Sequence, residues 1–485
     1  MSSNASTGGP FPSPPGGFAP APIQSNRRGV ELLLLGAAVL ITTISLVLVE
    51  ASQEQTITWD LAKYALAYLA LMTVAHLAVR RFAPYADPLL LPIVALLNGL
   101  GLVLIHRLDL ADQQQAQYLG DPIPSPDANQ QVLWTTLAIA GFVALLVLLR
   151  DYRTLARYGY TLGLAGLILL AIPALLPSAF SEVNGSKIWI RLPGFSLQPG
   201  EFAKILLLIF FASLLVSKRE LFTTAGKHWL GMDFPRARDL GPIIVVWIVS
   251  VGVLVFEKDL GTSLLIFGTV LVMIYIATER VGWIIIGSGM LLVGFFFAYQ
   301  AFSHVRVRTL TWLDPFADYN DTGYQISQSL FGLATGGLAG TGLGSGRPSQ
   351  VPFPKTDFII ATVGEELGLI GLAAVLILYL LFIIRGMHTA LAVRDSFGKL
   401  LAAGLSFTVA IQLFVVVGGV TKLIPLTGLT TPYMSYGGSS LLANYLLVAL
   451  LIKISDAARE PATPKKKPAV AAPIAEAPTE MVKRA

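Results

Sequence analysis

The sequence predicts an all-α protein, a polytopic transmembrane helical bundle with about twelve spans. Of its 485 residues, 54% are hydrophobic and only 13% are charged, whereas a soluble domain carries roughly 25% charged residues. This deficit repeats along the chain, which indicates many spans rather than one anchor on a globular domain. No run of strictly alternating residues typical of a β-barrel stands out, and lipid cannot satisfy exposed backbone groups. Helices are therefore the expected spanning elements.

Each span is an apolar stretch close to the roughly 20 residues that a helix needs to cross the hydrocarbon core. In chain order the predicted spans are 30–49, 61–79, 87–106, 131–149, 156–176, 200–216, 240–256, 260–277, 282–301, 360–384, 400–420 and 437–454. The seventh and eighth are short, and only the charged tripeptide 257–259 separates them. The longer connections are 107–130, 177–199, 302–359 and 421–436.

Basic residues set the expected orientation of the bundle. They gather in the connections on one side, at Arg27, Arg28, Arg80, Arg81, Arg150, Arg153, Arg157, Lys218, Arg219, Lys227, Arg236, Arg238, Arg385, Arg394, Lys399, Lys453 and Lys465–Lys467. By the positive-inside rule this side is cytoplasmic, so both termini lie inside and the longer connections face outside. The formal charge of +5 is thus explained by topology and does not predict nucleic-acid binding.

Two terminal segments lack an apolar core and are predicted to be disordered cytoplasmic tails. Residues 1–28 are rich in Pro, Gly, Ser and Ala and do not form a cleavable signal. Residues 457–485 form the second tail, whose lysines are expected to contact anionic membrane lipid. The outer loop 302–359 is the longest connection, and structureless loops of that size are uncommon unless functional. Its half-polar stretch 321–337 predicts an amphipathic helix at the membrane interface.

Several kinds of site are excluded or disfavoured. The chain has no cysteine, which rules out disulfides and thiolate nucleophiles. Its five histidines are scattered without a zinc-ligand spacing, and no GxSxG elbow or Ser-His-Asp pattern occurs. The Gly-rich run 336–346 is not a P-loop, because no GK[ST] follows and no strand precedes it. It fits a backbone anion cradle or, more readily, a flexible hinge.

The most informative stretch is residues 351–370, where charged residues adjoin and enter an apolar helix. Lys355 and Asp357 precede the helix, and Glu365 and Glu366 lie inside it. Charge at that depth is costly and requires a partner, a wet cavity or a functional role. For the two glutamates, a buried ion pair and a functional role remain equally open. For Asp357, at the surface edge beside proline and lysine, chemistry is the favoured interpretation.

Other charged residues carry two interpretations each. The run 257–259 (Glu-Lys-Asp) lies between two helices and fits mutual pairing at least as well as a substrate role. Glu201 and Lys204 have the i,i+3 spacing of a structural pair on a helix. Lys187 and Arg191 flank a tryptophan and fit either a membrane-surface anchor or a contact to a lipid phosphate.

Five ordered segments resemble the SEDS family (shape, elongation, division and sporulation). They are NGSKIWIRLPGFSLQPGEFAKI (184–205), EKDLGTSLL (257–265), GYQISQSLFGLATGGLAGTGLGSG (323–346), KTDFIIATVGEELGLIG (355–371) and IPLTGLTTPYMSYGGSSLL (424–442). The resemblance covers roughly residues 87–455, and its last motif is most similar to the elongation (RodA) branch. Two positions depart from the family pattern: Glu257-Lys258 stands in place of Gln-Pro, and Ile188 in place of a basic residue.

The resemblance implies a core of ten helices, and the chain has two further predicted spans before that core. We expect an extra N-terminal helix pair at 29–82 and a SEDS-type core at 83–456. An even number of added helices leaves the orientation of the core unchanged.

The resemblance also implies an activity, a substrate and a partner. The family polymerises lipid II, an undecaprenyl-diphosphate-linked disaccharide peptide, into glycan strands at the outer face of the cytoplasmic membrane, for elongation and shape. A single-pass class B penicillin-binding protein is the implied partner. Asp357 matches the family's essential acidic residue, and we expect it to act as a general base, an effect of about 10²–10⁴-fold.

The leaving diphosphate develops negative charge that cations must stabilise. The candidate cations, which the spacing does not rank, are Lys355, Lys187, Arg191, Arg306, Arg308, Arg347 and Lys422. A divalent cation (Mg or Mn) is the alternative source of charge, with no metal ligand predicted. Asp259 and Glu366 are secondary candidates for shaping the cavity.

Two other functions remain open. A transporter (flippase) for lipid II fits a large bundle with buried charge equally well, and Glu365 and Glu366 favour it, whereas the outer position of Asp357 opposes it. A scaffold that only recruits the penicillin-binding protein is the third candidate.

Overall fold

A computed structural model describes residues 27–53, 59–183, 185–192, 195–218, 225–229, 232–235 and 241–461. The predicted disordered tails lie outside these described residues, apart from Arg27, Arg28 and 457–461.

All twelve predicted spans coincide with helices. They are α1 (Arg28–Ser52), α2 (Trp59–Phe82), α3 (Leu90–Leu119), α4 (Asp127–Leu148), α6 (Gly159–Leu175), α8 (Pro199–Ser217), α10 (Gly241–Glu257), α11 (Leu260–Thr278), α12 (Val281–Ala301), α15 (Ile359–Ala392), α16 (Ser396–Val420) and α17 (Gly438–Arg459). Ten of these are long and apolar enough to cross a membrane, whereas α6 and the segment Ile244–Glu257 of α10 are shorter apolar helices. The chain is thus a multi-pass membrane protein with the predicted all-α architecture.

The remaining elements are short and connect the long helices. They are α5 (Thr154–Arg157), α7 (Ser178–Ser181), α13 (Ser303–Leu313), α14 (Tyr324–Gly336), the 3₁₀ turn η2 (Pro348–Gln350) and the strands β1 (Glu182–Val183), β2 (Ser186–Lys187), β3 (Ile190–Leu192), β4 (Phe195–Leu197), β5 (Ala225–Trp229) and β6 (Met232–Pro235). The strands form three antiparallel hairpins, β1–β2, β3–β4 and β5–β6. The amphipathic helix predicted within 321–337 is present as α14.

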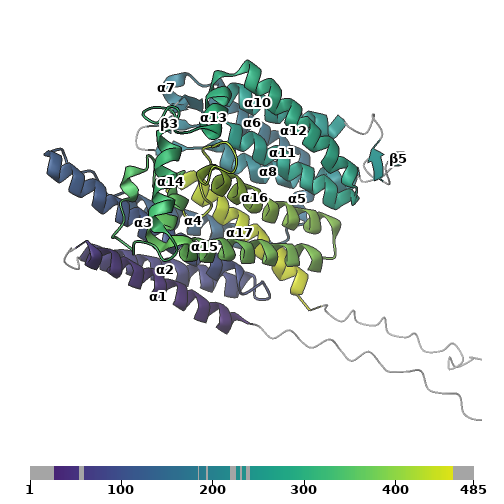
Figure 1. Cartoon of the computed structure of the whole chain (residues 1–485). Coiled ribbons are helices and arrows are strands. Elements are labelled where there is room, and N and C mark those ends of the chain that lie inside the picture. Colours follow the sequence, from purple (N-terminus) through teal and green to yellow (C-terminus); the bar gives the residue numbers. More distant parts are fainter. Residues whose placement is uncertain are drawn as a thin grey trace, which may run out of the picture.

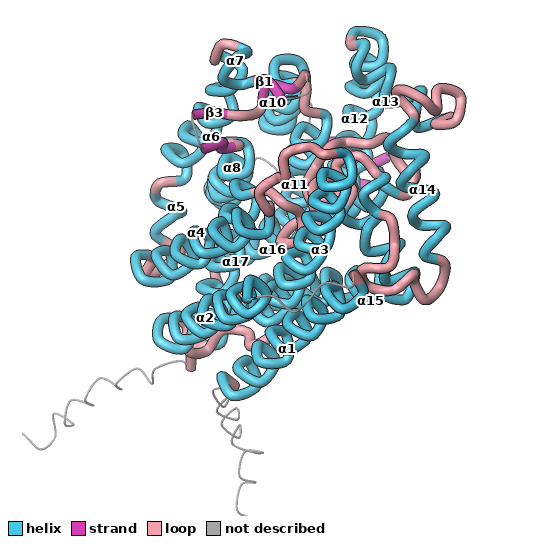
Figure 2. The backbone as a smooth tube through the Cα atoms, turned by 90° about the vertical axis from the view of Figure 1, so that its left-hand side faces the viewer, coloured by secondary structure: helices cyan, strands magenta, loops and turns pink. Residues whose placement is uncertain are grey.

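The long helices run side by side, and the bundle has two distinct ends (Figure 1). Helix α1 begins and α17 ends at one end, which we call the terminal end, and β5 lies there too. At this end Asp87 accepts hydrogen bonds from Arg385 and Arg459 at 2.7 and 2.6 Å. At the opposite end lie α7, β3, α13 and α14, with α14 crossing the direction of the bundle (Figures 1 and 2).

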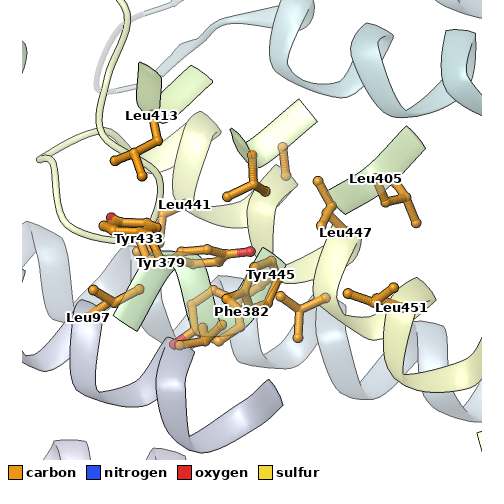
Figure 3. Close-up of a cluster of buried hydrophobic side chains, with 14 of the residues drawn as sticks. Leu97, Tyr379, Phe382, Leu405, Leu413, Tyr433, Leu441, Tyr445, Leu447 and Leu451 are labelled. Carbon is orange, nitrogen blue, oxygen red and sulfur yellow. The ribbon is translucent and has the colours of Figure 1, made fainter. Parts of the chain in front are cut away.

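A core of aromatic and aliphatic side chains anchors the connection between α16 and α17 (Figure 3). Tyr433 of that connection packs edge-to-face against Tyr445 of α17, with ring centroids 6.1 Å apart. The Phe382 ring of α15 lies 5.9 Å from the Tyr433 ring, and the Tyr379 hydroxyl donates to the Pro432 carbonyl. Edge-to-face pairs of this kind add stability beyond the area they bury. The segment 421–437 is therefore fixed on the helices beneath it.

Helix α15 breaks at Gly368, whose φ of 67° and ψ of −171° are not helical. A break inside a spanning helix leaves backbone groups that need other partners. Residues 337–347, which we call the strap, supply them: the N–H groups of Thr341 and Gly342 donate to the carbonyls of Glu365 and Glu366 at 3.0 Å. The N–H of Leu369 donates to the Gly337 carbonyl at 2.9 Å. The Gly-rich run is thus a paired structural segment in this structure, and the flexible hinge stays a prediction.

Glycine is needed on both sides of this contact because the two backbones almost touch. A Cβ atom on Gly368 would lie 2.2 Å from the Gly340 nitrogen, and one on Gly340 would lie 2.3 Å from the Glu366 carbonyl oxygen. Both glycines also have positive φ, which L-residues with a side chain rarely adopt.

The substitution Gly368→Ala should therefore destabilise the bundle, by at least the roughly 1–3 kcal/mol that a strained backbone position costs. We expect a lower thermal unfolding midpoint in detergent. The matched control is Gly36→Ala on α1, where a Cβ would meet nothing within 4 Å. An unchanged midpoint for Gly368→Ala would show that the strap does not hold the break.

Candidate functional site

A cavity of about 640 Å³ opens near α13 and α14, and several of the quoted motifs meet in its wall. Six of the polar side chains that line it are Asp357, Asp259, Arg308, Gln198, Glu201 and Tyr436. They come from the turn before α15, the start of α11, α13, the segment before α8, α8 itself and the α16–α17 connection. Segments more than 200 residues apart in sequence are thus brought to one polar space.

Asp357 lies in the turn before α15, with its carboxylate beside the guanidinium of Arg308. A Cβ atom on Gly428 would lie 3.6 Å from Asp357 Oδ2 and 3.8 Å from Arg308 Nη2, so both groups face the same spot. Gly428 has a φ of +78° and offers no side chain there. The bare backbone at this position leaves the acid and the cation open to the cavity.

Arg308 and Asp259 are held in place by their own hydrogen bonds. Arg308 Nη1 donates to the Thr427 carbonyl at 3.1 Å. Asp259 caps α11 and accepts from the Thr262 N–H at 2.9 Å and from the Thr262 hydroxyl at 2.6 Å. A capping aspartate satisfies an otherwise unpaired N–H of the first helical turn. Asp259 therefore has a structural role as well as a place in the cavity wall.

The electrostatic environment suits Asp357 for proton transfer. Burial raises the pKa of Asp357 to about 6, the negative charge of Asp259 raises it too, and Arg308 and the Thr356 side chain lower it. A general base works best when its pKa lies near the operating pH. Asp357 is thus largely deprotonated at neutral pH but more basic than an ordinary aspartate.

The α16–α17 connection fixes the turn that carries Asp357. The Ser435 hydroxyl donates to the Thr356 carbonyl at 2.6 Å, and the Tyr436 N–H donates to the Lys355 carbonyl at 2.8 Å. Because this connection is itself anchored in the aromatic core, the turn is tied to a rigid part of the bundle. The SYGGSS motif therefore contributes to the position of Asp357.

Lys355, predicted as a substrate-binding cation, points away from this space. Its ammonium lies 2.7, 2.7 and 2.8 Å from carboxylate oxygens of Asp109, Asp112 and Asp127. Burial lowers the pKa of Lys355, but the three carboxylates more than offset this and hold the pKa above its usual value. The side chain therefore joins the Asp357 turn to α3 and α4, and it does not line the cavity.

The other predicted site residues are distributed as follows. Asp259 and Arg308 join Asp357 in the cavity wall, whereas Glu366, Lys187, Arg191, Arg306, Arg347 and Lys422 are not among its described lining residues. Glu366 is fully buried and its Oε1 lies 2.9 Å from Nε of Arg107. The ion-pair interpretation of this glutamate is thus realised. The site roles predicted for the remaining cations stay predictions.

One residue of the wall, Glu201, belongs to a pair that the sequence assigned a structural role only. Lys204 Nζ lies 2.6 Å from Glu201 Oε2 and 3.1 Å from Gln412 Oε1, so the predicted i,i+3 pair is confirmed. Gln412 in turn donates to the Thr430 carbonyl at 2.8 Å. Sequence spacing found the pair but gave no sign that Glu201 also lines the cavity.

Lys355→Met should destabilise the protein, because three carboxylates would then face one another without a cation. Asp112 and Asp127 are partly exposed, so we expect about 1–3 kcal/mol, less than the loss of a fully buried pair costs. The measurement is the thermal midpoint in detergent, with Lys355→Arg as the charge-conserving control. Equal midpoints for Lys355→Met and the wild type would show that the contact of Lys355 with the three carboxylates does not stabilise the protein.

Comparison with known proteins adds independent evidence on the family. The FtsW/RodA/SpoVE family model, described as cell cycle protein, matches residues 88–460. The protein named peptidoglycan glycosyltransferase RodA of Mycobacterium tuberculosis is 61% identical over 466 residues, covering 96% of this chain and 98% of that protein. The protein of the same name from Mycobacterium leprae is 59% identical over 463 residues, covering 96% and 97%.

Two solved structures share the fold. A chain of the structure described as "Structural coordination of polymerization and crosslinking by a peptidoglycan synthase complex" has a TM-score of 0.59 and 26% identity, covering 76% of this chain and 97% of that chain. A mutant of the Thermus thermophilus rod shape determining protein RodA has a TM-score of 0.51 and 24% identity with the same coverage, which shows likeness of fold alone. With a family match over most of its length and the five ordered motifs in place, the chain belongs to the FtsW/RodA/SpoVE family.

Proposed function

We propose that the chain is a peptidoglycan glycosyltransferase that polymerises lipid II, with Asp357 as the general base. The observation that carries the proposal is the placement of Asp357 and Arg308 on one polar cavity. The high identity to proteins named peptidoglycan glycosyltransferase RodA supports the same activity.

In the proposed reaction the 4-hydroxyl of the acceptor sugar attacks C1 of the donor, with inversion at that carbon. The hydroxyl proton passes to Asp357, and the bond from C1 to the undecaprenyl diphosphate breaks. Negative charge grows on the leaving diphosphate, and the guanidinium of Arg308 is fixed close enough to Asp357 to stabilise it. Asp357 thus acts on the attacking hydroxyl and Arg308 on the leaving diphosphate of the same displacement.

We propose that the termini are cytoplasmic and that the cavity opens on the outer surface of the cell membrane. Of the described basic residues that predicted the cytoplasmic side, Arg28 begins α1 and donates to the carbonyls of Pro84 and Ala86, and Arg385 donates to Asp87; both lie at the terminal end of the bundle, where α1 begins and α17 ends. The cavity lies at the other end, beside α13 and α14. The acceptor and the growing glycan would then meet Asp357 outside the cell.

The partner and biological role are proposed from likeness. A related solved chain belongs to a complex described as coordinating polymerization and crosslinking, which supports a class B penicillin-binding protein as the partner. An elongation role is supported because the RodA relatives are 59–61% identical, whereas a protein named probable FtsW from Geobacter metallireducens is 36% identical over 326 residues.

For the diphosphate charge we propose Arg308 as the protein's own contribution. A divalent cation such as Mg²⁺ or Mn²⁺ would be held mainly by the substrate's diphosphate oxygens. The residues that the structure describes contain no group of three or more His, Asp or Glu side chains able to hold a metal ion. The positive charge of Arg308 acts on Asp357 and Asp259, two carboxylates of the cavity wall.

Asp357→Asn should abolish polymer formation from purified lipid II, because the amide cannot accept the hydroxyl proton. The general-base contribution sets the expected loss at about 10²-fold or more. Asp321→Asn, at an exposed position of the same outer segment, should retain wild-type activity. Polymerisation by Asp357→Asn at the wild-type rate would remove this residue from the mechanism.

The same preparations distinguish the competing functions. In reconstituted vesicles, movement of lipid II across the bilayer without chain growth would indicate a transporter. Polymer formation that depends on another glycosyltransferase in the preparation would indicate a scaffold.

The pH dependence of kcat/KM should report the pKa of Asp357. The folded-state pKa is about 6, raised from 3.8, so the active carboxylate form dominates above pH 6 and activity falls as the pH drops through 6. Since Arg308 lowers this pKa, Arg308→Met should move the midpoint upward and also reduce the rate.

Arg306→Met is the matched control. Arg306 lies two residues before Arg308 on α13 and donates to the carbonyls of Tyr299 and Gln300 instead. Its midpoint should equal that of the wild type. A midpoint that stays unchanged in Arg308→Met would mean that the titrating group is not Asp357.

A further inference from the structure

The helix pair α1–α2 precedes the region matched by the family model, which begins at residue 88. We propose that this pair is a positioning element of the active site, because it holds the strap against the broken helix α15. The inference rests on the proposed glycosyltransferase function and extends it to residues that do not touch the cavity.

The first line of contact runs from the end of α1 directly to the strap. Gln53 donates through its side-chain amide to the Gly344 carbonyl, and the hydroxyls of Ser52 and Ser345 lie 3.0 Å apart. The approach is close: a Cβ atom on Gly344 would lie 2.9 Å from the Ser52 Cβ and 3.2 Å from the Val49 carbonyl oxygen. The strap is thus pressed against the last turn of α1.

The second line of contact passes through α3. His106 Nε2 lies 3.5 Å from Glu50 Oε1 of α1, and its ring meets that of Tyr64 of α2 edge-on at 5.4 Å. The next residue, Arg107, forms the buried pair with Glu366 and donates to the Gly346 carbonyl at 2.8 Å. Both α1 and α2 therefore contact His106, and the adjacent residue Arg107 binds α15 and the strap.

The strap transmits both contacts to the helix that follows Asp357. Besides its backbone bonds to the break, it binds Glu365, whose Oε1 accepts from the Arg347 N–H at 2.6 Å. The residues from Phe358 to Glu365 are all buried, and α15 begins at Ile359. A displacement of the strap would therefore move the start of α15 and the carboxylate in front of it.

This arrangement predicts an effect on the rate of the chemical step rather than on substrate binding. The residues Glu50, Ser52, Gln53 and Tyr64 are absent from the described lining of the cavity, so their loss removes no substrate contact. A small misplacement of a catalytic group, in contrast, lowers kcat.

The first experiment locks the contact. The chain has no cysteine, so the double variant Ser52→Cys with Ser345→Cys introduces one unambiguous pair, and the adjacent hydroxyls place the two sulfurs near bonding distance. We expect the disulfide to form under mild oxidation and the oxidised protein to polymerise lipid II as fast as its reduced form. Failure to form the disulfide would show that the contact is absent. Inactivity that reduction reverses would show that the strap must leave α1 during turnover; either result overturns the proposal.

The second experiment weakens the contact. Gln53→Ala and Gln53→Glu both lack the donating N–H, and we expect kcat to fall about fivefold in each, because a displaced strap would misplace the carboxylate of Asp357. The KM for lipid II should stay unchanged, and Leu48→Ala, a substitution on an exposed face of α1, should match the wild type. A merely structural role would leave kcat per folded molecule unchanged in both Gln53 variants, and that outcome would refute the proposal.

The two proposals fail in different ways. If wild-type protein makes no polymer, the proposed function is wrong, and the disulfide still tests the contact. If the wild type polymerises and the Gln53 variants match it, only the positioning role is lost.

Discussion

The architecture depends on one constraint: α15 breaks inside the bundle, and the backbone groups freed at the break must find partners. Irregular backbone at membrane depth is tolerated only where protein or a wet cavity surrounds it. Here the strap 337–347 supplies hydrogen bonds to Glu365, Glu366 and the residues after Gly368. Gly340 and Gly368 are needed at the closest approach because a Cβ atom on either would collide with backbone. The Gly-rich sequence and the broken helix thus form one unit.

This unit explains how a carboxylate in a connecting segment can be held accurately. Asp357 lies at the edge of a buried helix start, its turn is bonded to the Ser435–Tyr436 segment, and Lys355 ties the same turn to α3 and α4. Catalytic groups work when neighbouring packing and hydrogen bonds fix their position. The partial burial that results is also what raises the pKa of Asp357 towards neutrality. Position and basicity therefore have the same cause.

The sequence predicted local features well and long-range pairings poorly. Hydropathy located all twelve long helices, and half-polar patterning located α14, because these depend on neighbours along the chain. The i,i+3 pair of Glu201 and Lys204 was found for the same reason. The partners of Lys355 lie more than 220 residues away in sequence, and no spacing rule connects them. The charge of Lys355 suggested a contact with substrate phosphate, whereas the fold places its ammonium against three carboxylates.

The choice of Arg308 among the predicted cations shows the same limit. Arg306 and Arg308 are two positions apart on α13, and the sequence treats them alike. The helix turns one towards the Thr427 carbonyl and the other towards the carbonyls of Tyr299 and Gln300. Side chains two apart on a helix point in different directions. Only the packing of α13 against the α16–α17 connection decides which of them meets Asp357.

The distribution of buried charge bears on the choice between a polymerase and a transporter. A transporter places its substrate site near mid-membrane, with charged groups available to the substrate. The inner charges here are already occupied, since Glu366 pairs with Arg107 and Glu365 accepts from the strap. Asp357 and Arg308 are among the charged residues that line the cavity, at the end of the bundle beside α13 and α14. Glu365 and Glu366, the feature that favoured transport, therefore serve the structure that positions Asp357, and the balance moves to surface chemistry.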